Sequence, residues 1–113
     1  MIKKAVLSIE GSEDIQIVST IVGTSILLNI SQTGRFGSIY SVKTPPMGGP
    51  ATIRRLLGIE SIPLEVAVDR IRRVVGPSPL LLTLAVPSLE TPGPAAVALL
   101  ESIQAELRTL LNA

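Results

Sequence analysis

The 113-residue chain contains no histidine, no cysteine and no tryptophan, and its only aromatic residues are Phe36 and Tyr40. Without cysteine it can form no disulfide, no thiolate metal site and no thiol nucleophile. Without histidine it has no Ser-His-Asp triad and no ordinary zinc site. Two aromatic residues are too few to build a platform on which the bases of a single-stranded nucleic acid stack. The composition therefore favours a binding protein over a catalyst.

Charge is also scarce, because charged residues make up 17% of the chain and the net charge is only +1. A sequence pI of about 8.2 is lower than that of a dedicated nucleic-acid binder. The nine carboxylates are scattered, with no spacing typical of a metal cage or an acid–base pair. We therefore expect a protein that is not an enzyme and needs no metal or cofactor.

Long apolar runs are missing too. The longest, Leu80–Val86, is interrupted by Thr83 and is far shorter than the roughly 20 residues of a membrane-spanning helix. The first residues, Met1–Lys4, are basic, but only a short apolar stretch follows, which does not resemble a signal-peptide core. These features predict a cytoplasmic protein with no membrane partner.

What the chain does have is aliphatic side chains, since Leu, Ile and Val supply 39 of the 113 residues. A chain of this length can bury one core without disulfides or metal, so we expect a single domain over residues 1–113. The apolar excess has two explanations: elements buried on both faces, or an apolar surface that a partner covers.

The first half of the chain shows the composition and alternation of strands. The short segment Thr33-Gly34-Arg35 predicts a hairpin turn, because Gly34 can adopt positive φ. Three prolines and two glycines in Thr44–Pro50 predict a mobile loop. The predicted strands are Lys4–Glu10, Ile15–Val22, Ser25–Gln32, Phe36–Lys43 and Thr52–Leu57.

The second half changes to helical spacing, with a continuous strand-like run between two amphipathic helices. The first helix extends from Pro63 to Val75 and the second from Pro94 to about Leu111. Glu101, Gln104 and Arg108 are expected to lie away from the apolar face of the second helix. The aliphatic run Leu80–Val86 predicts a central strand covered on both faces. The fold class is therefore α+β, with about six mostly antiparallel strands and two helices in the order βββββαβα.

Three local patterns are candidates for contacts with a partner. Gly34-Arg35-Phe36-Gly37 matches the GXXG loop with which KH domains bind nucleic acid, but its flanks resemble strands where a KH domain has helices. A turn is thus the favoured interpretation, and nucleic-acid binding the less favoured one. Pro46–Pro50 either connects two strands or contacts a partner, since an exposed Met47 adapts to many surfaces.

Two small basic groups are the third pattern: Arg54 and Arg55 on a strand, and Arg70, Arg72 and Arg73 on a helix. Solvated surface is the simpler interpretation, and contact with an acidic protein surface is the alternative. A homodimeric scaffold for some other client protein also remains open.

The order of segments from Ile15 to Leu110 resembles the third-type family of proteasome-assembling chaperones, in the form of an archaeal-like homologue. That family has a hydrophobic strand ending in a Thr/Ser-Gln pair, followed by a basic residue and glycine in a short hairpin. Ser31-Gln32 and Arg35-Phe36-Gly37 occupy those places here. A mobile loop follows, then a strand ending in Leu56-Leu57-Gly58, a helix, an aliphatic strand and a C-terminal helix.

The resemblance implies a chaperone without enzymatic activity that forms a homodimer, or pairs with a related chaperone, and binds α subunits of the 20S proteasome to promote α-ring formation. It also implies partner contacts through the hairpin and the Thr44–Pro50 loop. To these we add the two basic residues of the fifth strand, which the resemblance does not supply. Our candidate partner-binding residues are Arg35, Phe36, Thr44, Pro45, Pro46, Met47, Arg54 and Arg55.

Overall fold

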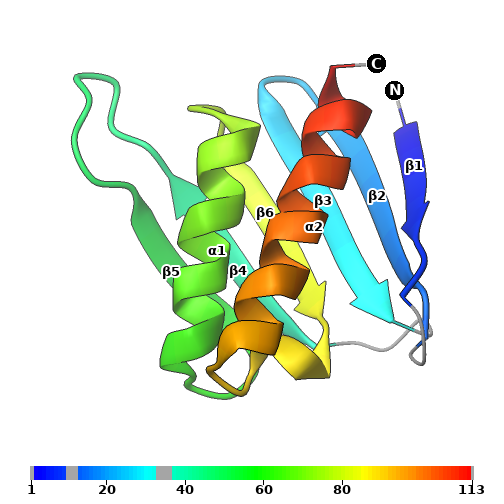
Figure 1. Ribbon diagram of the computed structural model, residues 1–113. Coiled ribbons are helices and arrows are strands. Elements are labelled where there is room, and N and C mark those ends of the chain that lie inside the picture. The colour runs from blue at the N-terminus through cyan, green and yellow to red at the C-terminus, as the bar shows by residue number, and fades with distance from the viewer. Residues whose placement is uncertain (1, 10–12, 33–36, 113) are drawn as a thin grey trace.

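The computed structural model describes residues 2–9, 13–32 and 37–112. Six strands form one sheet in the spatial order β1-β2-β3-β6-β4-β5, and both long helices lie on the same face of it (Figure 1). This α+β fold and its element order βββββαβα are as predicted. The elements are β1 (Ile2–Leu7), β2 (Ile15–Val22), β3 (Ser25–Gln32), β4 (Ser38–Lys43), β5 (Thr52–Leu57), α1 (Ile62–Val75), β6 (Leu80–Ala85), the 3-10 helix η1 (Pro87–Leu89) and α2 (Pro94–Leu111).

The sheet is mixed, because β6 lies between β3 and β4. It runs parallel to β3 in the register Ile26↔Leu80 and antiparallel to β4 in the register Tyr40↔Leu82, while the other neighbours are all antiparallel. The predicted hairpin between the third and fourth strands is therefore wrong. A strand as uniformly aliphatic as β6 belongs at the centre of the sheet, and it takes the pairing positions that β3 and β4 would have offered each other.

Local signals in the sequence set the ends of the helices. Ser61 caps α1, since its hydroxyl oxygen accepts a hydrogen bond from the Leu64 N–H at 3.3 Å. Gly76, with φ of 99°, ends α1, and a proline occupies the first turn of both α1 and α2. None of the helices in the described part of the chain has the length and apolarity that crossing a bilayer requires.

The core lies between the sheet and the helices. It is formed by alternate residues of β2, β3, β4 and β6, together with one stripe from each helix: Leu64, Val68 and Ile71 of α1, and Leu100, Ile103 and Leu107 of α2. One residue departs from the predicted stripe of α2. Gln104, expected on the outer face, is only 7% exposed, and its side-chain amide donates a hydrogen bond to the Arg70 carbonyl oxygen at 2.9 Å.

Strand β6 does not have the environment that its sequence predicts. Its neighbours β3 and β4 make it central, but helices cover only one of its faces, and Leu81 on the other face is 38% exposed. The prediction of cover on both faces is therefore wrong for the single chain. The apolar residues of the second face are left for something else to cover.

Candidate protein-interaction surfaces

The sheet face opposite the helices, here called the open face, is covered by no helix or strand of the described part of the chain (Figure 1). The strand registers align its side chains in cross-strand rows. One row contains Thr20, Leu27, Leu81 and Ser41, and the next contains Val18, Asn29, Thr83 and Ile39. Leu27 is 39% exposed, so like Leu81 it keeps much of its side chain in contact with solvent.

Among the described residues, charged side chains on the open face lie only at its margins. Lys4 lies on edge strand β1 and Arg54 on edge strand β5, and Lys43 occupies the end of β4. The rows between them contain only aliphatic and small polar residues. A hollow of about 350 Å³ lies at their centre, between Val18, Leu27 and Leu81. An uncharged centre within a charged rim is the composition of a protein–protein interface.

The Thr44–Pro50 loop, a predicted partner contact, connects β4 to β5 and extends beyond the end of the sheet (Figure 1). The Gly48 N–H donates a hydrogen bond to the Pro45 oxygen at 3.1 Å, which closes a turn at the tip. Met47 in this turn is 98% exposed, while Thr44 at the base is half-buried. The loop thus presents an adaptable apolar side chain in an exposed turn.

Arg54 and Arg55 do not act as one basic group, because adjacent strand residues point to opposite faces. Arg54 pairs with Ser41 and lies on the open face, whereas Arg55 pairs with Tyr40 and lies on the helix-covered face. Only Arg54 can therefore join a contact made by the open face. The other predicted contacts, Arg35 and Phe36, lie outside the described residues together with Gly34, so the GXXG interpretation is not tested.

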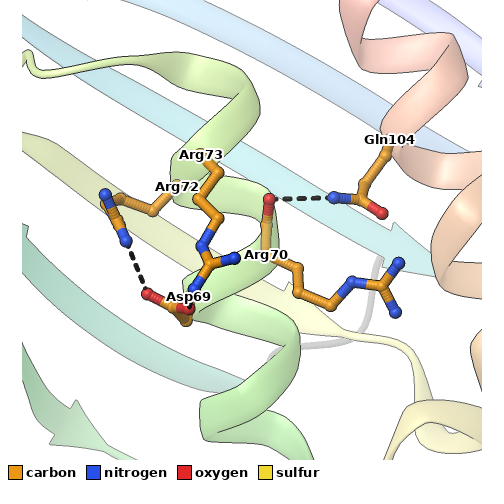
Figure 2. Close-up of polar contacts among 5 residues, drawn as sticks. All are labelled: Asp69, Arg70, Arg72, Arg73 and Gln104. Carbon is orange, nitrogen blue, oxygen red and sulfur yellow. Dashed lines mark hydrogen bonds and ion pairs between the residues drawn. The ribbon is translucent and has the colours of Figure 1, made fainter.

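The three arginines of α1 also do not form one group, because Arg70 lies apart from the other two (Figure 2). Arg72 and Arg73 both form ion pairs with Asp69, at 2.7 and 3.0 Å. The hydrogen bond from Arg72 and the positive charge of both guanidinium groups lower the pKa of the Asp69 carboxyl group. The third arginine, Arg70, makes no ion pair within the described part of the chain, and its side chain reaches from α1 toward α2 (Figure 2).

Tyr40 is the most buried polar side chain in the core, with none of its surface exposed. Its hydroxyl group has no hydrogen-bond partner among the described residues. Burial raises the pKa of the Tyr40 phenol, and the neighbouring Ser38 hydroxyl offsets part of that rise. This buried phenol lies in the core below the helices and is not a contact for a partner.

Two of these surfaces were not predicted as sites: the open face and the helix-side surface that Arg70 reaches. The sequence did contain an indication of the open face. Leu27 and Asn29 lie on one face of β3, and Leu81 and Thr83 lie on the same face of β6. Each of these pairs places an aliphatic residue where a solvated sheet face normally has a polar one.

Neither a family model nor a curated protein matches this chain. A solved structure with a similar fold is described as "Crystal Structure of a Novel Chaperone Complex for Yeast 20S Proteasome Assembly". The alignment has a TM-score of 0.72 and covers 95% of this chain and 98% of that chain, at 14% sequence identity. At this identity the comparison establishes a shared fold over nearly the full length of both chains.

Proposed function

We propose that this protein is a non-enzymatic, cytoplasmic assembly chaperone that dimerises and binds α subunits of the 20S proteasome to promote α-ring formation. The observation that carries the proposal is the shared fold, over nearly the full length of both chains, with a chain from the structure described as a chaperone complex for yeast 20S proteasome assembly. Independently, the order of segments and Ser31-Gln32 followed by Leu56-Leu57-Gly58 resemble a family of proteasome-assembling chaperones.

Dimerisation through the open face would complete the burial that the sequence of β6 predicts. Leu27 and Leu81 are neighbours in the β3–β6 register, and each is more than a third exposed in the single chain. Two sheets stacked face to face pack about 10 Å apart with their inner side chains interdigitated, so a second copy would cover both leucines. A related chaperone with a similar face could take the place of the second copy.

The α-subunit contact is assigned to the margin of the dimer, where the loop tip and the rim charge lie. Met47 supplies an exposed apolar contact, and Arg54 supplies a positive charge on the adjacent edge strand β5. Such a contact is small and partly polar, which suits a chaperone that must leave when the mature subunit interfaces form.

Retention of free α subunits on the immobilised protein tests this function. We expect the native chain to retain at least one type of α subunit, and the combined change Met47→Ser and Arg54→Glu to weaken retention roughly tenfold or more. A matched variant, Arg108→Glu on the exposed surface of α2, reverses one charge away from the loop and should retain α subunits normally.

Failure to retain any isolated α subunit would refute the proteasome assignment and would favour a scaffold with another client. Equal retention by the native chain and the double variant would preserve the function and refute the assigned contact. The rate of α-ring appearance, followed by native mass spectrometry with and without the protein, separates assembly from mere binding.

A further inference from the structure

A groove of about 440 Å³ lies on the helix side of the molecule, between the first halves of α1 and α2. The two helices lie side by side and begin at the same end of the sheet (Figure 1). The groove is lined mainly by aliphatic side chains. Three of them are exposed for their type: Ile62 at 73%, Val66 at 54% and Val97 at 47%.

Small residues leave this space open. Ala67 of α1 and Ala96 of α2 line the groove, and neither side chain is long enough to fill the gap between the helices. Farther along, the gap is bridged by the hydrogen bond from the Gln104 amide to the Arg70 carbonyl oxygen. The groove thus begins at the first turns of the helices and ends near Arg70.

Arg70 places one positive charge at that end of an otherwise apolar groove. It is half-buried, and no carboxylate of the described residues pairs with it, whereas Arg72 and Arg73 share Asp69 on another side of α1. Its side chain extends from α1 into the space before α2 (Figure 2). A half-buried cation beside an apolar surface is complementary to a ligand that combines aliphatic groups with one carboxylate.

We propose that this groove binds an amphipathic helix of a partner protein, with aliphatic side chains seated along Val66 and Val97 and a carboxylate paired with Arg70. A helix is assigned because α1 and α2 use their own backbone groups internally, so an extended segment would leave its buried N–H and C=O groups unpaired. Ile62 and Arg70 are about 12 Å apart along α1, which corresponds to roughly two turns of the bound helix.

This site is separate from the proposed dimer and α-subunit contacts. The groove is on the helix-covered side of the sheet, and the open face is on the other. Loss of binding in the groove would therefore leave dimerisation and α-subunit retention unchanged, so the two proposals can fail independently.

Fluorescence anisotropy with labelled amphipathic peptides of about 16 residues tests the site. Each peptide carries leucines at positions i, i+3 and i+7 and one glutamate, whose distance from the first leucine varies across the set. Each has a matched peptide with glutamine in place of the glutamate. We expect at least one glutamate peptide to bind, and its glutamine match to bind roughly fivefold more weakly or worse.

Substitutions in the groove, each with a matched control, test whether the peptides bind there. Ala96→Leu fills the space and should weaken every peptide roughly tenfold or more, whereas Ala105→Leu adds the same group on the exposed surface of α2 and should change nothing. Arg70→Gln should weaken the glutamate peptide to the level of its glutamine match, whereas Arg108→Gln should not. Val97→Ser, a milder change at an exposed position, checks the result if Ala96→Leu disturbs folding.

The proposal is overturned if no peptide binds, or if Ala96→Leu and Val97→Ser bind the peptides as well as the native chain does. It is also overturned if dodecanoate binds in the groove while no peptide does, because the site would then be one for small amphiphiles. Equal binding of glutamate and glutamine peptides would remove the assigned role of Arg70.

Discussion

Tyr40 carries a polar atom into the core, where the described residues give it no hydrogen bond. Removal of an unpaired buried hydroxyl group relieves a desolvation cost while it keeps most of the packing. We therefore expect Tyr40→Phe to change the free energy of unfolding by less than about 1 kcal/mol, in the stabilising direction. Urea unfolding measures the change, and a loss of more than that amount would show that the hydroxyl group has a stabilising partner.

The same phenol gives a dependence on alkaline pH. Its pKa in the folded chain is raised above the unfolded value of about 10, because burial disfavours the phenolate. The stabilisation linked to this shift is thus present below about pH 10 and is lost as the pH rises through the folded pKa. Phenolate absorbance reports Tyr40 alone, since the chain has no other tyrosine and no tryptophan. Identical titrations of the folded and urea-unfolded chain would contradict the shift.

Asp69 makes stability depend on acid pH with the opposite sign, because its pKa is lowered and not raised. Its folded-state pKa is lowered by Arg72 and Arg73, so the stabilisation from the ion pairs is present above the unfolded value of about 3.9. It is lost as the pH falls through the folded pKa. We expect Asp69→Asn to cost about 0.5–1 kcal/mol at neutral pH and almost nothing near pH 2, because these partly exposed pairs are screened.

Unfolding curves of Asp69→Asn at both pH values measure that difference. Glu101→Gln is the matched control, because Glu101 is exposed on α2 and makes no ion pair in the described part of the chain. A cost for Asp69→Asn that persists near pH 2 would show that the side chain stabilises α1 by a means other than its charge.

At the scale of elements, Gly58 directly follows β5 and packs closely against the start of β4. Its φ is +112°, and a β-carbon added there would lie 2.8 Å from the Cα of Ser38 at the start of β4. Gly23, in the turn between β2 and β3, also has positive φ, but an added β-carbon meets nothing within 4 Å. The two glycines therefore separate backbone strain from steric clash.

We expect Gly58→Ala to lower the free energy of unfolding by about 3 kcal/mol, and Gly23→Ala by about 1 kcal/mol. The first change adds a clash with backbone atoms to the strain of positive φ, and the second adds the strain alone. Thermal or urea unfolding of the two variants checks the difference. Equal costs would mean that β4 and β5 shift apart easily.

Elements that are defined by neighbouring residues could be predicted from the sequence. Proline and glycine mark the ends of α1 and α2, and period-two alternation marks β2 and β3. The central place of β6 was predicted, but the two strands beside it were not, because strand order depends on contacts between distant segments and β3 could equally have paired with β4.

Single side chains were missed for a related reason. Gln104 has the composition of a surface residue, but its burial depends on a backbone carbonyl group that α1 presents across the helix pair. The adjacency of Arg54 and Arg55 suggested one basic group, and the alternation of the strand separates them. The loop was predicted as a partner contact and stays a prediction, whereas the open face was not predicted because it depends on which strands are neighbours.

At the scale of the whole molecule, the open face should determine the oligomeric state. We expect the native chain to be a dimer at micromolar concentration, and Leu81→Arg to be a monomer with unchanged circular dichroism. The reason is that an arginine at the centre of an apolar interface would be desolvated without a partner. Light scattering coupled to size-exclusion chromatography measures the mass.

Ala98→Arg provides the control for that experiment, because it adds the same charge on the exposed surface of α2 and should leave the dimer intact. A native chain that is monomeric at this concentration would refute dimerisation through the open face. A dimer that survives Leu81→Arg would assign the interface to another surface.

The central place of β6 has a consequence for the synthesis of the chain. The strands β1–β3 and β4–β5 form two separate groups, and only β6, which follows them in sequence, joins one to the other. Until the ribosome has released residues 80–85, both groups carry an exposed strand edge, and such edges invite pairing with other chains. The nascent protein therefore passes most of its translation with an incomplete sheet, and we expect truncation before β6 to leave an aggregation-prone fragment.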